Sequence, residues 1–250
     1  MKLHQLTRRV YWTPGNHETD RPTLGCICGD RHTLLIDCGA SPAHIREMLS
    51  ALQAAGLPSP TLAVVTHAHW DHVFGMSALN IPVIASTRTQ QQLIRMESWA
   101  WTEEAMLRRL HTREDILFCH EHMLKEYPDP SVIRVRRADI VFDEALSLDL
   151  GGCTVHLRLL PNSHAEDCAV ILCPDEDVLF TGDITYMDLH ADPPCWHTRR
   201  YHALLSALAE TDFTTAVPGH QEPMERSAFF ADLRDALRAD AAEGIPLVDD

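Results

Sequence analysis

The sequence lacks the segments that would place it in or across a membrane. No apolar run approaches the ~20 residues of a spanning helix, and the first residues, MKLHQLTRRVYW, contain no apolar core of a secretory signal. The eight cysteines are scattered and form no Cys-x-x-Cys pair, which favours reduced thiols over a disulfide framework. These absences predict a cytoplasmic protein that does not bind membranes.

Positive charge is also scarce. The 250 residues include 21 Lys and Arg against 36 Asp and Glu, a net charge of −15. An anionic chain repels phosphate backbones, and no basic stripe is visible, so nucleic acid is not an expected partner. A small molecule is the expected substrate, and the sequence leaves open whether the chain forms a homodimer.

What is present suits one globular domain over residues 1–250, because 45% of the residues are hydrophobic and 23% charged. Ser41 and Pro42 predict the start of a helix that ends near Gly56. Strands and then a helix recur in two halves, and the predicted hairpins favour mixed sheets. The predicted strands are 24–28, 33–37, 62–66, 81–85, 145–150, 154–160, 168–173, 178–181 and 214–217, and two later helices are 198–209 and 227–242.

Residues 88–127 have a different character. Their Gln, Glu, Arg, Met and Leu predict two or three helices, with Thr112 and Asp115 resembling a capping box at the start of one of them. This helical insertion is either a lid over a site or part of the scaffold.

Three histidines and an aspartate crowd the loop after the predicted strand 62–66. They are His67, His69, Asp71 and His72. Imidazoles and carboxylates are costly to bury without a partner, and both are ligands for zinc and iron. Four donors exceed what one catalytic ion with an open position needs, so the surplus indicates two ions.

Three more candidate ligands occupy the same context, a position just past a short apolar strand. His164, Asp183 and His220 follow Ser163, Gly182 and Gly219, and small residues there allow the backbone to approach an ion closely.

These motifs together resemble those of the metallo-β-lactamase-fold hydrolase superfamily, over about residues 24–220. The resemblance implies an α+β fold, a four-layer αββα sandwich of two mixed sheets. It also implies that His67, His69 and His164 hold one metal, that Asp71, His72 and His220 hold the second, and that Asp183 bridges both. The sequence is more similar to the thioesterase and lactonase branches, including the glyoxalase II type, than to true β-lactamases. Those usually lack a histidine at the position of His72 and have a cysteine at that of Asp183.

The implied activity is hydrolysis by a hydroxide that bridges two Zn²⁺ ions, with iron or manganese as alternative metals. The hydroxide would attack an ester, thioester, lactone or amide carbonyl, with Asp71 and Asp183 as catalytic residues that position it. The alternatives are a phosphodiesterase using the same metal pair, a mononuclear iron persulfide dioxygenase, and a non-catalytic ligand-binding member.

Other residues are weaker candidates. Tyr186, Trp196 and His197 could line a substrate pocket, and Arg199 could face an anionic substrate. Asp167 either bonds a ligand histidine or turns the chain. His120 and His122 look like metal ligands, but residues two apart on a helix point to different faces, which argues against a shared ion.

Overall fold

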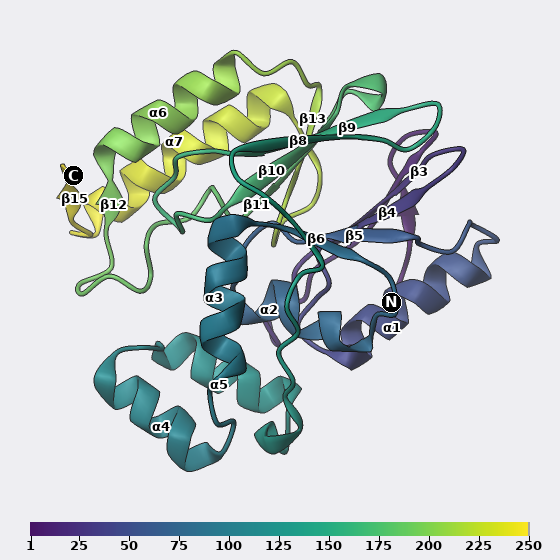
Figure 1. Ribbon diagram of the computed structural model, residues 1–250. Helices are drawn as coiled ribbons and strands as arrows, with labels where there is room; N and C mark the ends of the chain where they lie inside the picture. Colours follow the sequence, from purple (N-terminus) through teal and green to yellow (C-terminus); the bar gives the residue numbers. More distant parts are fainter. Residues whose placement is uncertain (250) are drawn as a thin grey trace.

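Two β-sheets form the centre of the protein in the computed structural model, which describes residues 1–249 (Figure 1). The first sheet has seven strands in chain order, antiparallel from β1 to β4 and parallel from β4 to β7. Its strands are β1 (His4–Gln5), β2 (Val10–Thr13), β3 (Leu24–Cys28), β4 (Thr33–Ile36), β5 (Leu62–Val64), β6 (Val83–Ser86) and β7 (Ile140–Phe142).

The second sheet has six strands in the order β14-β13-β11-β10-β9-β8, antiparallel except for the parallel pair of β11 and β13. Both large sheets are therefore mixed, as the sequence predicts. The strands are β8 (Ala145–Asp149), β9 (Thr154–Leu159), β10 (Ala169–Cys173), β11 (Val178–Gly182), β13 (Thr215–Pro218) and β14 (Met224–Glu225), and a separate pair joins β12 (Trp196–His197) to β15 (Leu247–Val248).

Helices cover the outer faces of both sheets (Figure 1). α1 and the helices of the insertion contribute to a core on the outside of the first sheet, and α6 and α7 pack on the outside of the second. The predicted αββα sandwich is therefore confirmed. The helices are α1 (Pro42–Ala54), α2 (Trp70–Val73), α3 (Thr87–Glu97), α4 (Glu103–Thr112), α5 (Leu117–Glu126), α6 (Thr198–Ala209) and α7 (Arg226–Ala242), with 3-10 turns η1 (Phe74–Ala78), η2 (Pro130–Val132) and η3 (Pro174–Glu176).

Local sequence signals explain several helix ends. Ser41 caps α1 by accepting a hydrogen bond from the His44 N–H at 3.1 Å, and Gly56 follows the helix with a φ of +70°. The capping-box prediction at Thr112 is wrong, because Thr112 is the last residue of α4 and the cap of that helix is Thr102. The two-residue strands and β7 were not predicted, since segments this short carry little periodicity.

The insertion of residues 88–127 folds as α3, α4 and α5, which group together beside α2 (Figure 1). No helix within residues 1–249 combines the length and hydrophobicity needed to cross a bilayer.

The layer between the sheets depends on one small residue. A Cβ at Gly25 of β3 would lie 2.4 Å from Cε1 of Phe180, which reaches across from β11 and is 3% exposed. The missing side chain therefore makes room for the ring, which packs in the buried core between the sheets.

We expect Gly25→Val to destabilise the protein by about 1–3 kcal/mol, because the added methyls overpack the layer between the sheets. Phe180→Leu removes the clashing ring edge, so the double variant should lose less stability than the sum of the two single variants. Urea denaturation of all four proteins measures this coupling, and strictly additive losses would contradict the proposed contact.

Candidate metal centre

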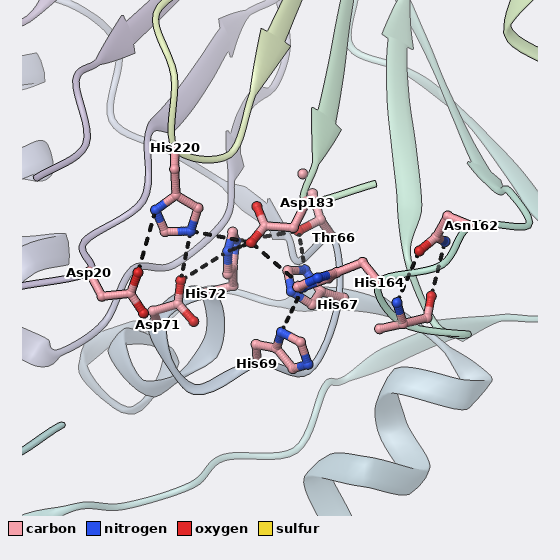
Figure 2. Close-up of polar contacts among 12 residues, drawn as sticks. Asp20, Thr66, His67, His69, Asp71, His72, Asn162, His164, Asp183 and His220 are labelled. Carbon is pink, nitrogen blue, oxygen red and sulfur yellow. Dashed lines mark hydrogen bonds and ion pairs between the residues drawn. The ribbon is translucent and has the colours of Figure 1, made fainter. Parts of the chain in front are cut away.

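The predicted ligands come from four loops that meet at one end of the sheets (Figure 2). His67 and His69 follow β5, and Asp71 and His72 lie in the short helix α2 that begins directly after them. His164 lies between β9 and β10, and Asp183 and His220 follow β11 and β13. Parallel pairing of β11 with β13 brings the last two side by side.

The first ligand group contains three histidines, His67, His69 and His164, whose donor nitrogens lie within 4.8 Å of one another. Nδ1 of His69 is 2.9 Å from Nε2 of His164. Nε2 of His67 is buried and has no hydrogen-bond partner. A buried polar atom without a partner is costly, so this arrangement fits a cation between the three rings.

The second group contains Asp71, His72, Asp183 and His220, also within 4.8 Å. Oδ2 of Asp71 lies 3.1 Å from Nε2 of His72 and 3.2 Å from Nε2 of His220. Oδ2 of Asp183 lies 3.2 Å from Nε2 of His220, 3.5 Å from that of His72 and 3.7 Å from Nε2 of His164. Asp183 therefore faces both groups, which is the position that a bridging carboxylate requires.

Two glycines make room for this approach. Gly182 adopts a φ of +52°, and a Cβ on Gly219 would lie 1.9 Å from Oδ1 of Asp183. Local geometry therefore favours glycine at these two positions, whereas the close approach of the backbone to an ion stays a prediction.

Burial and neighbouring charges shift the histidine pKa values of the two ligand groups in different directions. Burial, and repulsion between neighbouring imidazoles, lower the pKa of His67 and of His69 well below the usual value. Burial also lowers the pKa of His164, against the attraction of Asp183. The three-histidine group is thus neutral, the state in which imidazole binds a metal.

The second group holds protons in the metal-free protein. Burial opposes charge on His72 and His220, but Asp71 and Asp183 outweigh it and raise the pKa of His72 strongly and that of His220 to about 10. Burial likewise opposes charge on the two carboxylates, and the same imidazoles overcome it and lower both carboxylate pKa values.

Sequence reasoning missed a residue that holds the ligands from behind. Asp37, with a φ of +60°, directly follows β4. Its Oδ2 accepts a hydrogen bond from Nδ1 of His72 at 2.8 Å, and its Oδ1 accepts one from the N–H of Thr66 at 2.7 Å. Oγ1 of Thr66 in turn lies 3.0 Å from Nδ1 of His67. Asp37 shares the context of the predicted ligands, an aspartate just past an apolar strand, and that signal could have identified it.

Asp167 fixes the loop itself. Its Oδ2 accepts a hydrogen bond at 2.9 Å from the N–H of Ala68, the residue between two predicted ligands. It therefore bonds the backbone of the ligand loop rather than an imidazole ring.

Asp20 is a second residue that sequence reasoning missed. It has a φ of +54°, and its Oδ1 lies 3.8 Å from Nδ1 of His220 (Figure 2). The next residue, Arg21, donates to both carboxylate oxygens of Glu126 in α5, at 2.9 and 2.8 Å. The loop that carries Asp20 is thus anchored to the helical insertion.

Two cavities open on the centre. The smaller, of about 240 Å³, is lined by Asp71, Asp183 and His220 and also by Tyr186. The Tyr186 ring centroid lies 6.0 Å from that of His164 and 6.2 Å from that of His220. Tyr186 therefore lines the smaller cavity beside the candidate ligands, and its contact with a substrate stays a prediction.

The other three predicted substrate residues lie outside the walls of both cavities. Trp196 is 1% exposed, and its indole N–H donates to a carboxylate of α7. His197 donates its backbone N–H to Oγ of Ser163, behind His164. Arg199 lies on α6, and its side chain is 72% exposed. His120 and His122 join no ligand group among residues 1–249.

The model of the metallo-beta-lactamase superfamily matches residues 25–220, which include every predicted ligand. The chain belongs to the metallo-beta-lactamase superfamily. This confirms the resemblance seen in the sequence at the level of the superfamily, whereas the closer likeness to the thioesterase and lactonase branches stays a prediction.

Several solved structures share the fold. A metallo-beta-lactamase from Pontibacter korlensis aligns with a TM-score of 0.66 and 17% identity, over 95% of this chain and 98% of that one. A B3 metallo-beta-lactamase with an active-site glutamic acid aligns with a TM-score of 0.66 and 15% identity, over 98% and 91%. The sec-alkylsulfatase Pisa1 from Pseudomonas sp. aligns with a TM-score of 0.71 and 16% identity, over 96% of this chain and 41% of that one. No curated protein matches the sequence significantly.

We expect Asp37→Asn to weaken metal binding by about 10–100-fold, because asparagine has one acceptor oxygen for the two hydrogen bonds that Asp37 accepts, from the N–H of Thr66 and from Nδ1 of His72. Competition with a chromophoric chelator measures the affinity. Asp139→Asn is a matched control, since Asp139 accepts a backbone N–H from Val83 and touches no ligand. Equal losses in the two variants would contradict a role for Asp37 in orienting His72.

The two groups should differ in their response to pH. Metal binding at the second group displaces the protons of His72 and His220, on the order of two protons per ion near pH 7, whereas the three-histidine group releases none. Affinity at the second group should therefore fall as pH falls, and more steeply than at the first group. Calorimetric titration in buffers of different ionisation enthalpy counts the protons, and equal release at both steps would contradict the assignment.

Proposed function

We propose that the protein is a dinuclear zinc-dependent hydrolase that acts on a carbonyl of a small ester, thioester, lactone or amide. The observation that carries this proposal is the position of Asp183, whose Oδ2 lies within 3.7 Å of imidazole nitrogens from both ligand groups. Superfamily members are metal-dependent hydrolases, and this chain retains a complete His/Asp centre.

The residues of the centre have separable tasks. His67, His69 and His164 would hold one ion, and Asp71, His72 and His220 the other, with Asp183 shared. Two bound ions would supply a water with its pKa lowered from ~15.7 toward ~7, and such a water is a nucleophile at neutral pH. Asp71 and Asp183 balance the charge of the site, and Asp71, at the edge of the smaller cavity, would position that water and accept its proton.

Hydrogen bonds from neighbouring residues orient the candidate ligand histidines in the absence of substrate. Asp37 keeps the Nδ1 proton on His72, which leaves Nε2 as the ligand atom. The carbonyl of Met187 lies 3.3 Å from Nδ1 of His164 and selects Nε2 of that ring in the same way.

Other activities are less well supported. A mononuclear iron oxygenase needs a single group of two histidines and one aspartate, whereas both complete groups converge here. A phosphodiesterase could use the same metal pair, but a net charge of −15 disfavours nucleic-acid substrates, and the cavity of about 240 Å³ over the centre suits a small molecule.

We expect protein purified without chelator to carry two metal ions per chain by elemental mass spectrometry, and to hydrolyse members of a panel of thioesters and lactones. Asp183→Asn should reduce turnover by at least about 10³-fold and weaken both ions, because a neutral amide is a poor bridging ligand.

His122→Ala is the matched control, a buried histidine outside both ligand groups whose loss should leave the metal content unchanged. A fully metallated and active Asp183→Asn variant would overturn the bridging role. A protein that binds no ion even after reconstitution would overturn the hydrolase proposal as a whole.

A further inference from the structure

A second and larger cavity extends the centre into the helical insertion. It has a volume of about 520 Å³ and lies between the ligand loop and residues of α3, of α5 and of the loops before and after α4. Its wall shares His69, His164, Cys119 and His190 with the smaller cavity. A substrate whose carbonyl lies at the metal centre can therefore extend a second group into this space.

The rim and the floor of this cavity differ chemically. The rim is exposed and polar, and its cations have partners: Arg95 pairs with Glu114 at 3.1 Å, and Nη1 of Arg88 donates to the backbone O of Glu166 at 2.9 Å. The floor is buried and apolar, with side chains from several elements. It includes Trp70, Phe74, Met96, Trp101 and Met123. A floor of this kind favours an apolar or aromatic group.

One carboxylate interrupts the apolar floor. Asp115, between α4 and α5, is 8% exposed and lines the cavity. Its Oδ1 accepts the N–H of Ile116 at 2.9 Å, and it forms no ion pair with a cation within residues 1–249. Burial raises the pKa of Asp115, against the attraction of nearby His190 and Arg109.

Nearby Arg109 forms no ion pair with Asp115 within residues 1–249, although its Nε and Nη2 are buried without a hydrogen-bond partner. The guanidinium of Arg109 lies between the rings of Trp99 and Trp101, 4.6 Å from each centroid, and its Nη1 donates to the backbone O of Ala100 at 2.9 Å. Asp115 is thus a buried anion with unused acceptor capacity that faces a space large enough for a ligand. The other buried carboxylate in this wall, Asp167, already bonds the N–H of Ala68.

We propose that Asp115 is a specificity-determining residue that accepts a hydrogen bond from a nitrogen donor carried by the apolar part of the substrate. The substrate class is then an acyl compound whose hydrophobic or aromatic group bears an amine or amide N–H, with that group in the larger cavity. This inference rests on the proposed function for the orientation of the substrate, but the recognition of the donor does not require catalysis.

Binding of three probes with a common phenylalkyl group tests the inference on the full chain, both as purified and after chelation. The probes are 3-phenylpropylamine, 3-phenylpropanamide and 3-phenylpropanoate, and quenching of tryptophan fluorescence reports their binding. We expect the amine or the amide to bind at least about 10-fold more tightly than the carboxylate, because a hydrogen bond to a buried anion is worth about that much. The order of the two donors shows whether the site prefers a cationic or a neutral nitrogen.

Asp115→Asn should remove this preference by weakening the donors about 10-fold without weakening the carboxylate probe. Glu121→Gln is the matched control, an exposed acid of α5 outside the walls of both cavities, and should change each affinity less than about 2-fold. Equal losses in the two variants would assign the effect to net charge and overturn the inference. Should Asp115→Asn fail to fold, Asp115→Ser takes its place in the same comparison with the control variant, and equal affinities in these two variants overturn the inference.

The outcomes separate the two proposals. Donor preference that depends on Asp115 in a protein without hydrolytic activity would leave this inference standing and remove the proposed function. Hydrolysis with no dependence of binding on Asp115 would do the reverse.

Discussion

The carboxylate of Asp183 faces imidazoles from both ligand groups, and much of the fold serves to keep it there. Asp183 directly follows β11, which pairs in parallel with β13, the strand that precedes His220. Gly219 has no side chain at the point where a Cβ would lie 1.9 Å from Oδ1 of Asp183, and Gly182 turns the chain with a positive φ. Such crowding of charge is stable only because the neighbouring rings compensate it or a cation does, since an isolated buried carboxylate costs several kcal/mol.

Hydrogen bonds from residues behind the candidate ligands hold these loops in place. Asp37 connects β4 to Thr66 and His72, and Asp167 holds the backbone of Ala68 from the opposite sheet. Each contact joins segments far apart in the chain, so the ligand positions depend on the sandwich as a whole. Rotamers fixed in this way let the centre bind ions without a large ordering cost.

The helical insertion determines the surroundings of the candidate metal centre. Its helices contribute to the walls of both cavities, and Glu126 at the end of α5 binds Arg21 next to Asp20, which in turn lies near His220. The same insertion therefore shapes both cavities and is connected, through Arg21 and Asp20, to the candidate ligand His220. Proteins that share this sandwich can differ in substrate through such loops while the centre is retained.

The sequence by itself determined the location of the insertion and the seven residues that converge, because strand-end positions and His/Asp spacing are local signals. The four-layer sandwich followed from the family resemblance that these motifs carry. Local signals also fixed the start of α1 at Ser41, but they misplaced a helix cap at Thr112. Only the tertiary structure decided which neighbours those residues meet: Asp37 and Asp20 behind the ligands, Tyr186 in a cavity wall, Trp196 in the core, and Asp115 in an apolar floor. The physical reason is that burial and pairing are set by contacts between segments distant in the chain, and the residue types alone do not record these contacts.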